Sequence, residues 1–262
     1  MSAILLENAI VHYEVLGRGR PTLFLHGWVG SWRYWIPVMQ VVSNSFRTYA
    51  IDMWGFGDTA KDATRYTLER QLQLLDSFLE EMGIARLALV GHGLGAVLAL
   101  MFARRHPDMV DRVMAVSCPL DETMLSSRLS SPALPELVEW LLGGDTLSDP
   151  VRLEIPKTDP GAIQASLNGI KSVNLQALWK DLKTACLFVN GQNDPAVSPP
   201  RLDQLSDLPY MIHAVSFEGS GHFPMINETS KFCRLLADFL ALSSGDSPRE
   251  LQVKDEWKRR VR

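Results

Sequence analysis

Short apolar runs alternate along the chain with longer segments whose apolar residues recur every three or four positions. The runs have the length of buried strands, and the periodic segments have the spacing of helices that cover a sheet. We expect strands over 3–6, 9–15, 22–25, 46–51, 86–90, 112–117, 186–189 and 211–217, and helices over 31–42, 68–82, 94–105 and 229–242. This alternation predicts an α/β fold with a mostly parallel sheet covered by helices on both faces.

The alternation stops between residues 120 and 182, a stretch rich in Leu, Ser and Pro that predicts several short helices, including 135–142 and 162–170. It resumes afterwards, and from Ser243 the composition becomes linker-like and then charged. We therefore divide the chain into a core (1–119 and 183–243), a helical insert (120–182) and a charged tail (244–262).

The charged tail carries Val253, Trp257 and Val261 at a spacing that would form one stripe on a helix. We interpret it as a solvated segment packed loosely on the body. A contact with a partner or a membrane surface is the alternative.

The composition is that of an ordinary globular domain, with 46% hydrophobic and 21% charged residues among 262. A net charge of −4 argues against nucleic acid or an anionic membrane as a partner. No apolar run approaches the roughly 20 residues of a membrane span, and the first ten residues lack a basic leader. The three cysteines lack metal-ligand or redox spacing. We expect a cytoplasmic protein without metal or cofactor, and the sequence assigns no oligomeric state.

A glycine-dense turn, Gly-His-Gly-Leu-Gly at 91–95, joins a predicted strand to an Ala/Leu-rich helix. This is the setting of the G-x-S-x-G nucleophile elbow, in which a strained turn exposes a serine. Its central residue is Gly93, which has no side chain to attack with, so an acyl-enzyme at this position is excluded. Glycine adopts the positive φ of such a turn freely, and we expect it to leave space where a water could lie.

His222 and Asp194 follow late predicted strands in polar loops. A histidine in Gly-Ser-Gly-His-Phe-Pro is hard to explain as core packing, so we predict that His222 holds the position of a catalytic base. Asp194 would accept its Nδ1–H and fix the tautomer. The alternatives are a surface-loop histidine and an aspartate that only starts a turn before Pro195.

Two backbone amides complete the predicted site. The amide of Trp28 follows the strand-ending His26-Gly27, and the amide of Leu94 lies at the start of the helix after the elbow, so both could stabilise an oxyanion. We expect His26 and His92 to have structural roles. Ser117 and Cys118, at the end of the next strand, are the alternatives for a displaced nucleophile.

Together these segments resemble the α/β-hydrolase superfamily, in its branch of small esterases, haloperoxidase-like enzymes and C–C bond hydrolases. The matching motifs are HGW at 26–28, D-x-x-G-x-G at 52–57, GHGLG at 91–95, GQND at 191–194 and GHFP at 221–224. The resemblance implies an eight-stranded, mostly parallel sheet and a helical cap over 120–182, with a substrate pocket between cap and core. It also implies that Asp194 and His222 are acid and base and that the Trp28 and Leu94 amides form the oxyanion hole.

The chain departs from that family at two positions. Gly93 stands where the family has Ser, Cys or Asp, and Asp58 stands where a serine usually follows D-x-x-G-x-G. The first departure puts covalent catalysis in doubt, and we interpret the second as a change in a turn only.

Aromatic and aliphatic residues near the predicted site indicate a small apolar ligand, with Trp28, Trp140, Leu141 and Phe223 as substrate-binding residues. One interpretation is general-base chemistry through water on an ester, amide or ketone. A second is an inactivated form of a serine hydrolase. The third is a non-catalytic pseudoenzyme that binds a small apolar ligand or a protein partner through the capped pocket.

Overall fold

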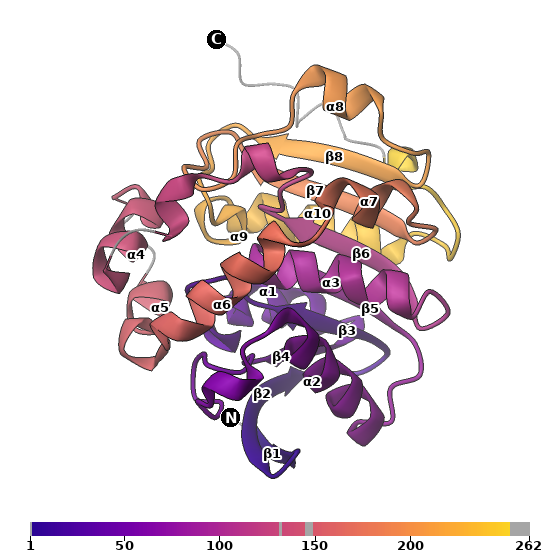
Figure 1. Ribbon diagram of the computed structural model, residues 1–262. Helices are drawn as coiled ribbons and strands as arrows, with labels where there is room; N and C mark the ends of the chain where they lie inside the picture. The colour runs from indigo at the N-terminus through magenta and orange to yellow at the C-terminus, as the bar shows by residue number, and fades with distance from the viewer. Residues whose placement is uncertain (1, 131–132, 145–148, 252–262) are drawn as a thin grey trace.

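The computed structural model describes residues 2–130, 133–144 and 149–251. Within them the chain forms an eight-stranded sheet in the order β1-β2-β4-β3-β5-β6-β7-β8 (Figure 1). The strands are β1 Ser2–Leu6, β2 Ala9–Leu16, β3 Arg20–Leu25, β4 Phe46–Ile51, β5 Leu87–His92, β6 Val110–Val116, β7 Ala185–Gly191 and β8 Ile212–Phe217. The pairs β1–β2 and β2–β4 are antiparallel and the other neighbours are parallel, which confirms the predicted fold class.

Helices cover both faces of the sheet, with α1 and α10 packed together on one and α2 and α3 on the other (Figure 1). The elements outside the β6–β7 connection are η1 Trp32–Trp35, α1 Ile36–Val42, η2 Ala63–Arg65, α2 Leu68–Glu81, α3 Leu94–Arg105, α8 Leu202–Ser206, α9 Pro224–Asn227, α10 Thr229–Ala241 and η6 Pro248–Glu250. The helix expected over 31–42 is instead a 3-10 turn followed by α1. Pro37 is the reason, because it has no N–H to donate to the carbonyl of Arg33.

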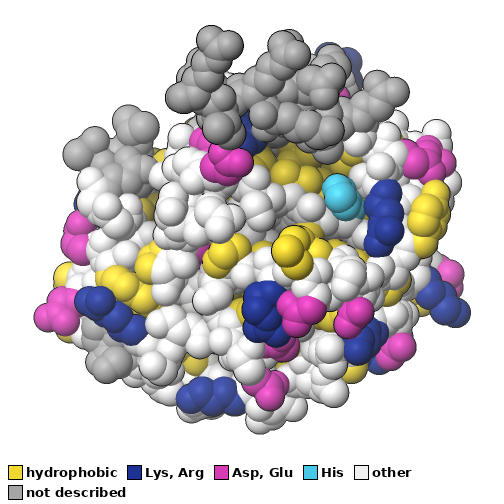
Figure 2. Space-filling view, turned by 90° about the horizontal axis from the view of Figure 1, so that it is seen from above, with side chains coloured by type: hydrophobic (Ala, Val, Ile, Leu, Met, Phe, Trp, Pro, Cys, Tyr) yellow, Lys and Arg dark blue, Asp and Glu magenta, His cyan; other side chains and the backbone are white. Residues whose placement is uncertain are grey.

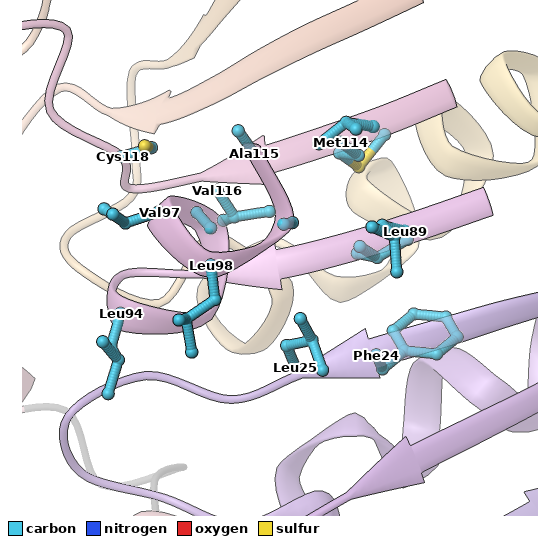
Figure 3. Close-up of a cluster of buried hydrophobic side chains, with 14 of the residues drawn as sticks. Phe24, Leu25, Leu89, Leu94, Val97, Leu98, Met114, Ala115, Val116 and Cys118 are labelled. Carbon is cyan, nitrogen blue, oxygen red and sulfur yellow. The ribbon is translucent and has the colours of Figure 1, made fainter. Parts of the chain in front are cut away.

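The central strands are buried on both faces, which explains why they read as uninterrupted apolar runs. Figure 3 shows Leu25 of β3 beside Leu98 in the first turns of α3, whereas Phe24 packs against Trp35 on the other face of the sheet. The start of α3 is therefore fixed by the core, and with it the turn that joins β5 to α3.

Between β6 and β7 the described residues form only short helices. They are η3 Glu122–Met124, η4 Ser127–Ser130, α4 Leu134–Leu142, α5 Asp149–Arg152, η5 Ile155–Lys157, α6 Pro160–Lys171 and α7 Leu175–Lys180. Backbone and side-chain hydrogen bonds join this segment to the loop after β4: Asp159 N–H donates to the Gly55 carbonyl, and the Tyr66 hydroxyl donates to the Asp159 carboxylate. The segment therefore lies at the carboxyl ends of the parallel strands.

The linker-like residues after α10 pack on the body, which differs from the expected loose tail. Ser247 is fully buried and donates to the Tyr210 carbonyl. Arg249 donates to the carbonyls of Leu208, Pro209 and Ile212. One guanidinium thus provides hydrogen-bond donors for three carbonyls in and next to the loop before β8. The predicted stripe of Val253, Trp257 and Val261 lies outside the described residues.

Charged side chains of both signs are interspersed on the face seen in Figure 2, without a broad region of one sign. In the part of the chain that the structure describes, no helix is long and apolar enough to cross a membrane. Nor does that part contain a cluster of three His, Cys, Asp or Glu side chains that could hold a metal ion.

Candidate functional site

Gly93 forms the sharp turn between β5 and α3, with φ 52° and ψ −112°. An L side chain is strained at this φ, whereas glycine is not. The turn is held by the Gly93 N–H, which donates to the Val116 carbonyl at 2.9 Å, and by the Gly95 N–H, which donates to the His26 carbonyl at 3.1 Å. The elbow therefore keeps the sharp turn of the motif, and with glycine at its centre this turn carries no strain and no nucleophile.

Asp194 and His222 form a buried pair at the ends of β7 and β8. The His222 Nδ1 lies 2.9 and 3.0 Å from the two carboxylate oxygens of Asp194, and both side chains are at most 1% exposed. The amides of Ala196 and Val197 donate to Oδ1 of Asp194 and fix the carboxylate. Because a carboxylate only accepts, Nδ1 carries the proton and Nε2 presents its lone pair, the tautomer that a general base needs.

The amides of Trp28 and Leu94 belong to buried residues, and among the described residues neither donates to a protein acceptor. Their neighbours do: the Gly27 amide donates to the Tyr34 hydroxyl, and the Gly95 amide donates to a carbonyl. Buried amides are rarely left unpaired. The two open donors flank the elbow at the carboxyl ends of β3 and β5.

The indole of Trp28 fills the space in front of Gly93. A Cβ built on Gly93 would lie 3.1 Å from Cε3 and 3.1 Å from Cζ3 of the indole. The indole also lies nearly parallel to the His222 imidazole, at 18° and 6.3 Å between ring centres. The open space for a water that we expected next to Gly93 is therefore partly occupied by an aromatic ring.

His92 supports the loop that carries His222. Its Nε2 donates to the His222 carbonyl at 2.8 Å, so its Nδ1 is the acceptor for the Tyr34 hydroxyl at 3.0 Å. Burial holds the pKa of His92 well below its ordinary value, and the ring is neutral. Tyr34 was missed in the sequence because its partners lie far away in the chain.

His26 supports the loop that carries Trp28 in the same way. Its Nδ1 donates to the Gly27 carbonyl, and its Nε2 accepts from the Met53 amide. Burial lowers the pKa of His26 to about 4, so the ring is neutral at physiological pH. It joins the ends of β3 and β4 as a neutral structural bridge.

Comparison with known proteins agrees with this arrangement. The family model described as alpha/beta hydrolase fold matches residues 21–154, which is about half of the chain. The chain belongs to the alpha/beta hydrolase fold family. It is 29% identical to 2-hydroxy-6-oxo-2,4-heptadienoate hydrolase of Pseudomonas putida, over 86% of this chain and 91% of that protein.

A second relative of this α/β-hydrolase chain is epoxide hydrolase 3 of Xenopus tropicalis, which is 32% identical over 72% of the chain. The match spans about half of that protein, 53% of its length. Among solved structures, a meta-cleavage product hydrolase superposes with a TM-score of 0.79 at 21% identity, over 91% of this chain and 97% of the other. That likeness supports the fold alone.

Neither alternative nucleophile of this α/β hydrolase faces the base. The Ser117 hydroxyl donates to the His222 backbone carbonyl at 2.9 Å rather than to the imidazole. The Cys118 thiol bonds to the Pro119 carbonyl, and burial raises the pKa of that thiol far above its ordinary range. Neither Ser117 nor Cys118 therefore has the geometry of a nucleophile that could replace the missing serine at the elbow.

Of the predicted substrate-binding residues, Trp28 and Phe223 lie against the base, and Trp140 and Leu141 lie on α4. Phe223 is buried and packs edge-on against the His222 ring, with the ring centres 5.1 Å apart. Trp140 is half-buried beneath the Arg128 guanidinium, 5.0 Å from its ring centre, and Leu141 is buried.

Asp58 is more than a turn residue, and our interpretation of it was wrong. Its carboxylate pairs with Arg33 at 2.8 Å and with Lys157 of η5 at 3.0 Å. Arg33 also pairs with the buried Glu154 at 3.2 Å, so these charges join the α/β-hydrolase core to the helical segment. The Asp58 amide donates to the carboxylate of Asp52, which is fully buried. Burial raises the pKa of Asp52 to about 7.

Proposed function

We propose that this chain is a hydrolase-like enzyme that acts on a small apolar ester, amide or ketone without a covalent acyl-enzyme. His222 removes a proton from water or from the substrate through Nε2, and Asp194 keeps the imidazole in the required tautomer. The amides of Trp28 and Leu94 stabilise the oxyanion or enolate that forms. The reaction forms no acyl-enzyme, because Gly93 offers no atom to acylate, and the protonated His222 returns its proton to the leaving group when the oxyanion collapses.

The observation that carries this proposal is the Asp194–His222 pair. A binding pocket has no use for a buried imidazole that is held on one nitrogen and open on the other. Keeping this pair costs desolvation, which the hydrogen bonds of the Asp194 carboxylate offset. The geometry therefore supports proton transfer rather than ligand storage.

The helical segment over 120–182 acts in this proposal as a cap, and the substrate lies between the cap and the core. Trp28 and Phe223 provide the apolar wall beside the base, and Trp140 and Leu141 provide the wall on α4. Turnover is expected to be slow, because loss of a triad nucleophile can remove about 10⁶ in rate and leave about 10³–10⁴ over water.

The alternative is a pseudoenzyme that binds a small apolar ligand or a protein partner, derived from a serine hydrolase by loss of the nucleophile. The packing of Trp28 on Gly93 favours this alternative, because it fills room that a nucleophile and its substrate would share. The two functions predict opposite roles for His222.

Hydrolysis of p-nitrophenyl butyrate by the full-length protein and by His222→Ala tests the proposal. We expect slow turnover that falls by about 10²–10⁴ in the variant, the usual effect of losing a general base. His213→Ala, which changes a histidine on β8 away from the elbow, should leave the rate unchanged. Equal rates for wild type and His222→Ala, with both proteins folded, would support the pseudoenzyme.

A further inference from the structure

A cavity of about 300 Å³ lies at the amino ends of β3, β5 and β6, at the opposite edge of the sheet from Gly93. This is within the size range of small-molecule sites, which begins at about 300 Å³. No residue of the proposed catalytic site lines it. An inference about this cavity therefore stands independently of the proposed function.

The inner wall of the cavity is apolar apart from one hydroxyl. Phe46, Leu87 and Leu240 contribute buried aliphatic and aromatic surface. Thr22 is fully buried, and its Oγ1 has no hydrogen-bond partner among the described residues. A buried hydroxyl without a protein partner is unusual in a folded protein and indicates room for a solvent atom at the inner wall of the cavity.

The mouth of the cavity is cationic. Arg20 uses only Nη2, which donates to the Leu240 carbonyl, and Arg86 uses only Nη2, which donates to Asp111 and Ser244. In the part of the chain that the structure describes, the remaining N–H groups of both guanidiniums donate to no protein acceptor.

The formal charges around the cavity do not balance. The guanidiniums of Arg20, Arg86 and Arg112 line it together with a single carboxylate, that of Asp111. Arg112 and Arg86 share that carboxylate, at 2.6 and 2.8 Å, so it cannot also neutralise Arg20. A local excess of positive charge beside an apolar wall suits an anion that carries an apolar body.

Backbone irregularity marks the same place. The β5–β6 register shifts between Leu87 and Ala88, so that Ala88 pairs with Arg112 and Asp111 is passed over. Such bulges redirect side chains and are common beside functional sites. Here Asp111 has no partner residue on β5, and its side chain forms the ion pair with Arg86 at the mouth of the cavity.

We propose that this cavity binds a small carboxylic acid with an aliphatic body. The chain of the acid lies against Phe46 and Leu240, and its carboxylate accepts the unused N–H groups of Arg20 and Arg86. Carboxylate suits this mouth because a planar guanidinium can donate two parallel hydrogen bonds to it. A water bound to the Thr22 hydroxyl would close the inner end of the site, beyond the end of the alkyl chain.

Isothermal titration calorimetry of the full-length protein with octanoate, 1-octanol and octylammonium tests the proposal. We expect octanoate to bind and the two other probes to bind at least about tenfold more weakly, because they lack the charge that the arginines recognise. Inorganic phosphate at equal concentration should not displace octanoate, since it has no apolar body. Equal binding of octanol, displacement by phosphate, or no octanoate binding at all would overturn the proposal.

Variants then place the binding. Arg20→Gln/Arg86→Gln should weaken octanoate binding by about tenfold or more, whereas Arg201→Gln, which changes an exposed arginine just before α8, should not. Thermal unfolding confirms that each variant is folded. Because the proposed catalytic site contains neither Arg20 nor Arg86, octanoate that binds there would be insensitive to the double substitution. Unchanged affinity in a folded double variant would therefore also overturn the proposal.

Discussion

The indole of Trp28 faces Gly93, close enough that a Cβ on this glycine would lie 3.1 Å from two of the indole carbons. The residue whose amide we assign to the oxyanion hole thus also fills part of the nucleophile's space with its side chain. The two positions form one unit, and a substitution at either changes the other.

Gly93→Ser should create a reactive but hindered nucleophile. Its Oγ gains the His222 base, but the side chain is strained at φ 52°, at a cost of about 1–3 kcal/mol, and the indole must move by a few tenths of an ångström. We expect slow labelling by a fluorophosphonate and measurable esterase activity. Trp28→Phe/Gly93→Ser should label faster, since the smaller ring leaves room and keeps the amide.

Gly93→Ala is the matched control, because it carries the same backbone strain and no hydroxyl. It should be destabilised like Gly93→Ser and remain unlabelled. A folded Gly93→Ser protein that never labels would show that the base and the elbow are not aligned for catalysis.

Asp52 predicts a specific dependence of stability on pH. Its carboxyl has a folded pKa of about 7, above the ordinary 3.8, mainly because it is buried and also because Glu154 and Asp58 lie nearby. The folded state therefore holds a proton that the unfolded state releases, and this group lowers stability as pH rises from about 4 to 7. The full effect is up to about 4 kcal/mol.

Urea unfolding of wild type and Asp52→Asn at pH 5 and pH 8 measures this effect. Wild type should lose more stability between the two pH values than the variant does. The remaining titratable groups are common to both proteins, so their contributions cancel in this comparison. An equal change in the two proteins would show that Asp52 titrates in its ordinary range.

The charges around Arg33 predict unequal costs for removing each one. Asp58→Ser, which introduces the residue usual in the family, breaks pairs whose side chains are about a quarter exposed and should cost about 1 kcal/mol. Arg33→Met should cost about 3 kcal/mol, because it takes an ion pair from Glu154, whose side chain is 1% exposed. Lys157→Met serves as the control, because it also removes a partner of Asp58 but leaves the buried Glu154 paired with Arg33.

Denaturant midpoints together with hydrogen exchange over residues 154–162 check this ranking. The exchange should quicken in Asp58→Ser, since the helical segment loses a tie to the core. If Arg33→Met were no more costly than Lys157→Met, Glu154 would not depend on this guanidinium.

Asp194→Asn should impair the base without removing it. An asparagine amide can donate to Nδ1, which would leave the proton on Nε2, the wrong nitrogen for proton abstraction. The loss in kcat can approach about 10⁴ for this substitution in a triad. The pH profile of kcat/KM distinguishes this role from a structural one, because a wrong tautomer lowers the rate at every pH above the imidazole pKa.

The fold could be predicted from the sequence because its strands are buried on both faces and therefore form continuous apolar runs such as 22–25 and 186–189. The order of the motifs likewise predicted the family. The motifs do not encode contacts between distant residues. Tyr34 with His92, and Asp58 with Lys157, come together only when separate strand ends and the helical segment pack, and no local pattern signals them. The contact of Trp28 with Gly93 depends on a side-chain rotamer that spacing cannot reveal.

The most direct test of the central claim is intact mass spectrometry of the wild-type protein during turnover of p-nitrophenyl butyrate, with Gly93→Ser as the positive control for acylation. Our account predicts that wild-type protein releases p-nitrophenol at a rate that depends on His222 while its mass stays unchanged. A butyryl adduct on wild-type protein, on any residue, would contradict hydrolysis without an acyl-enzyme.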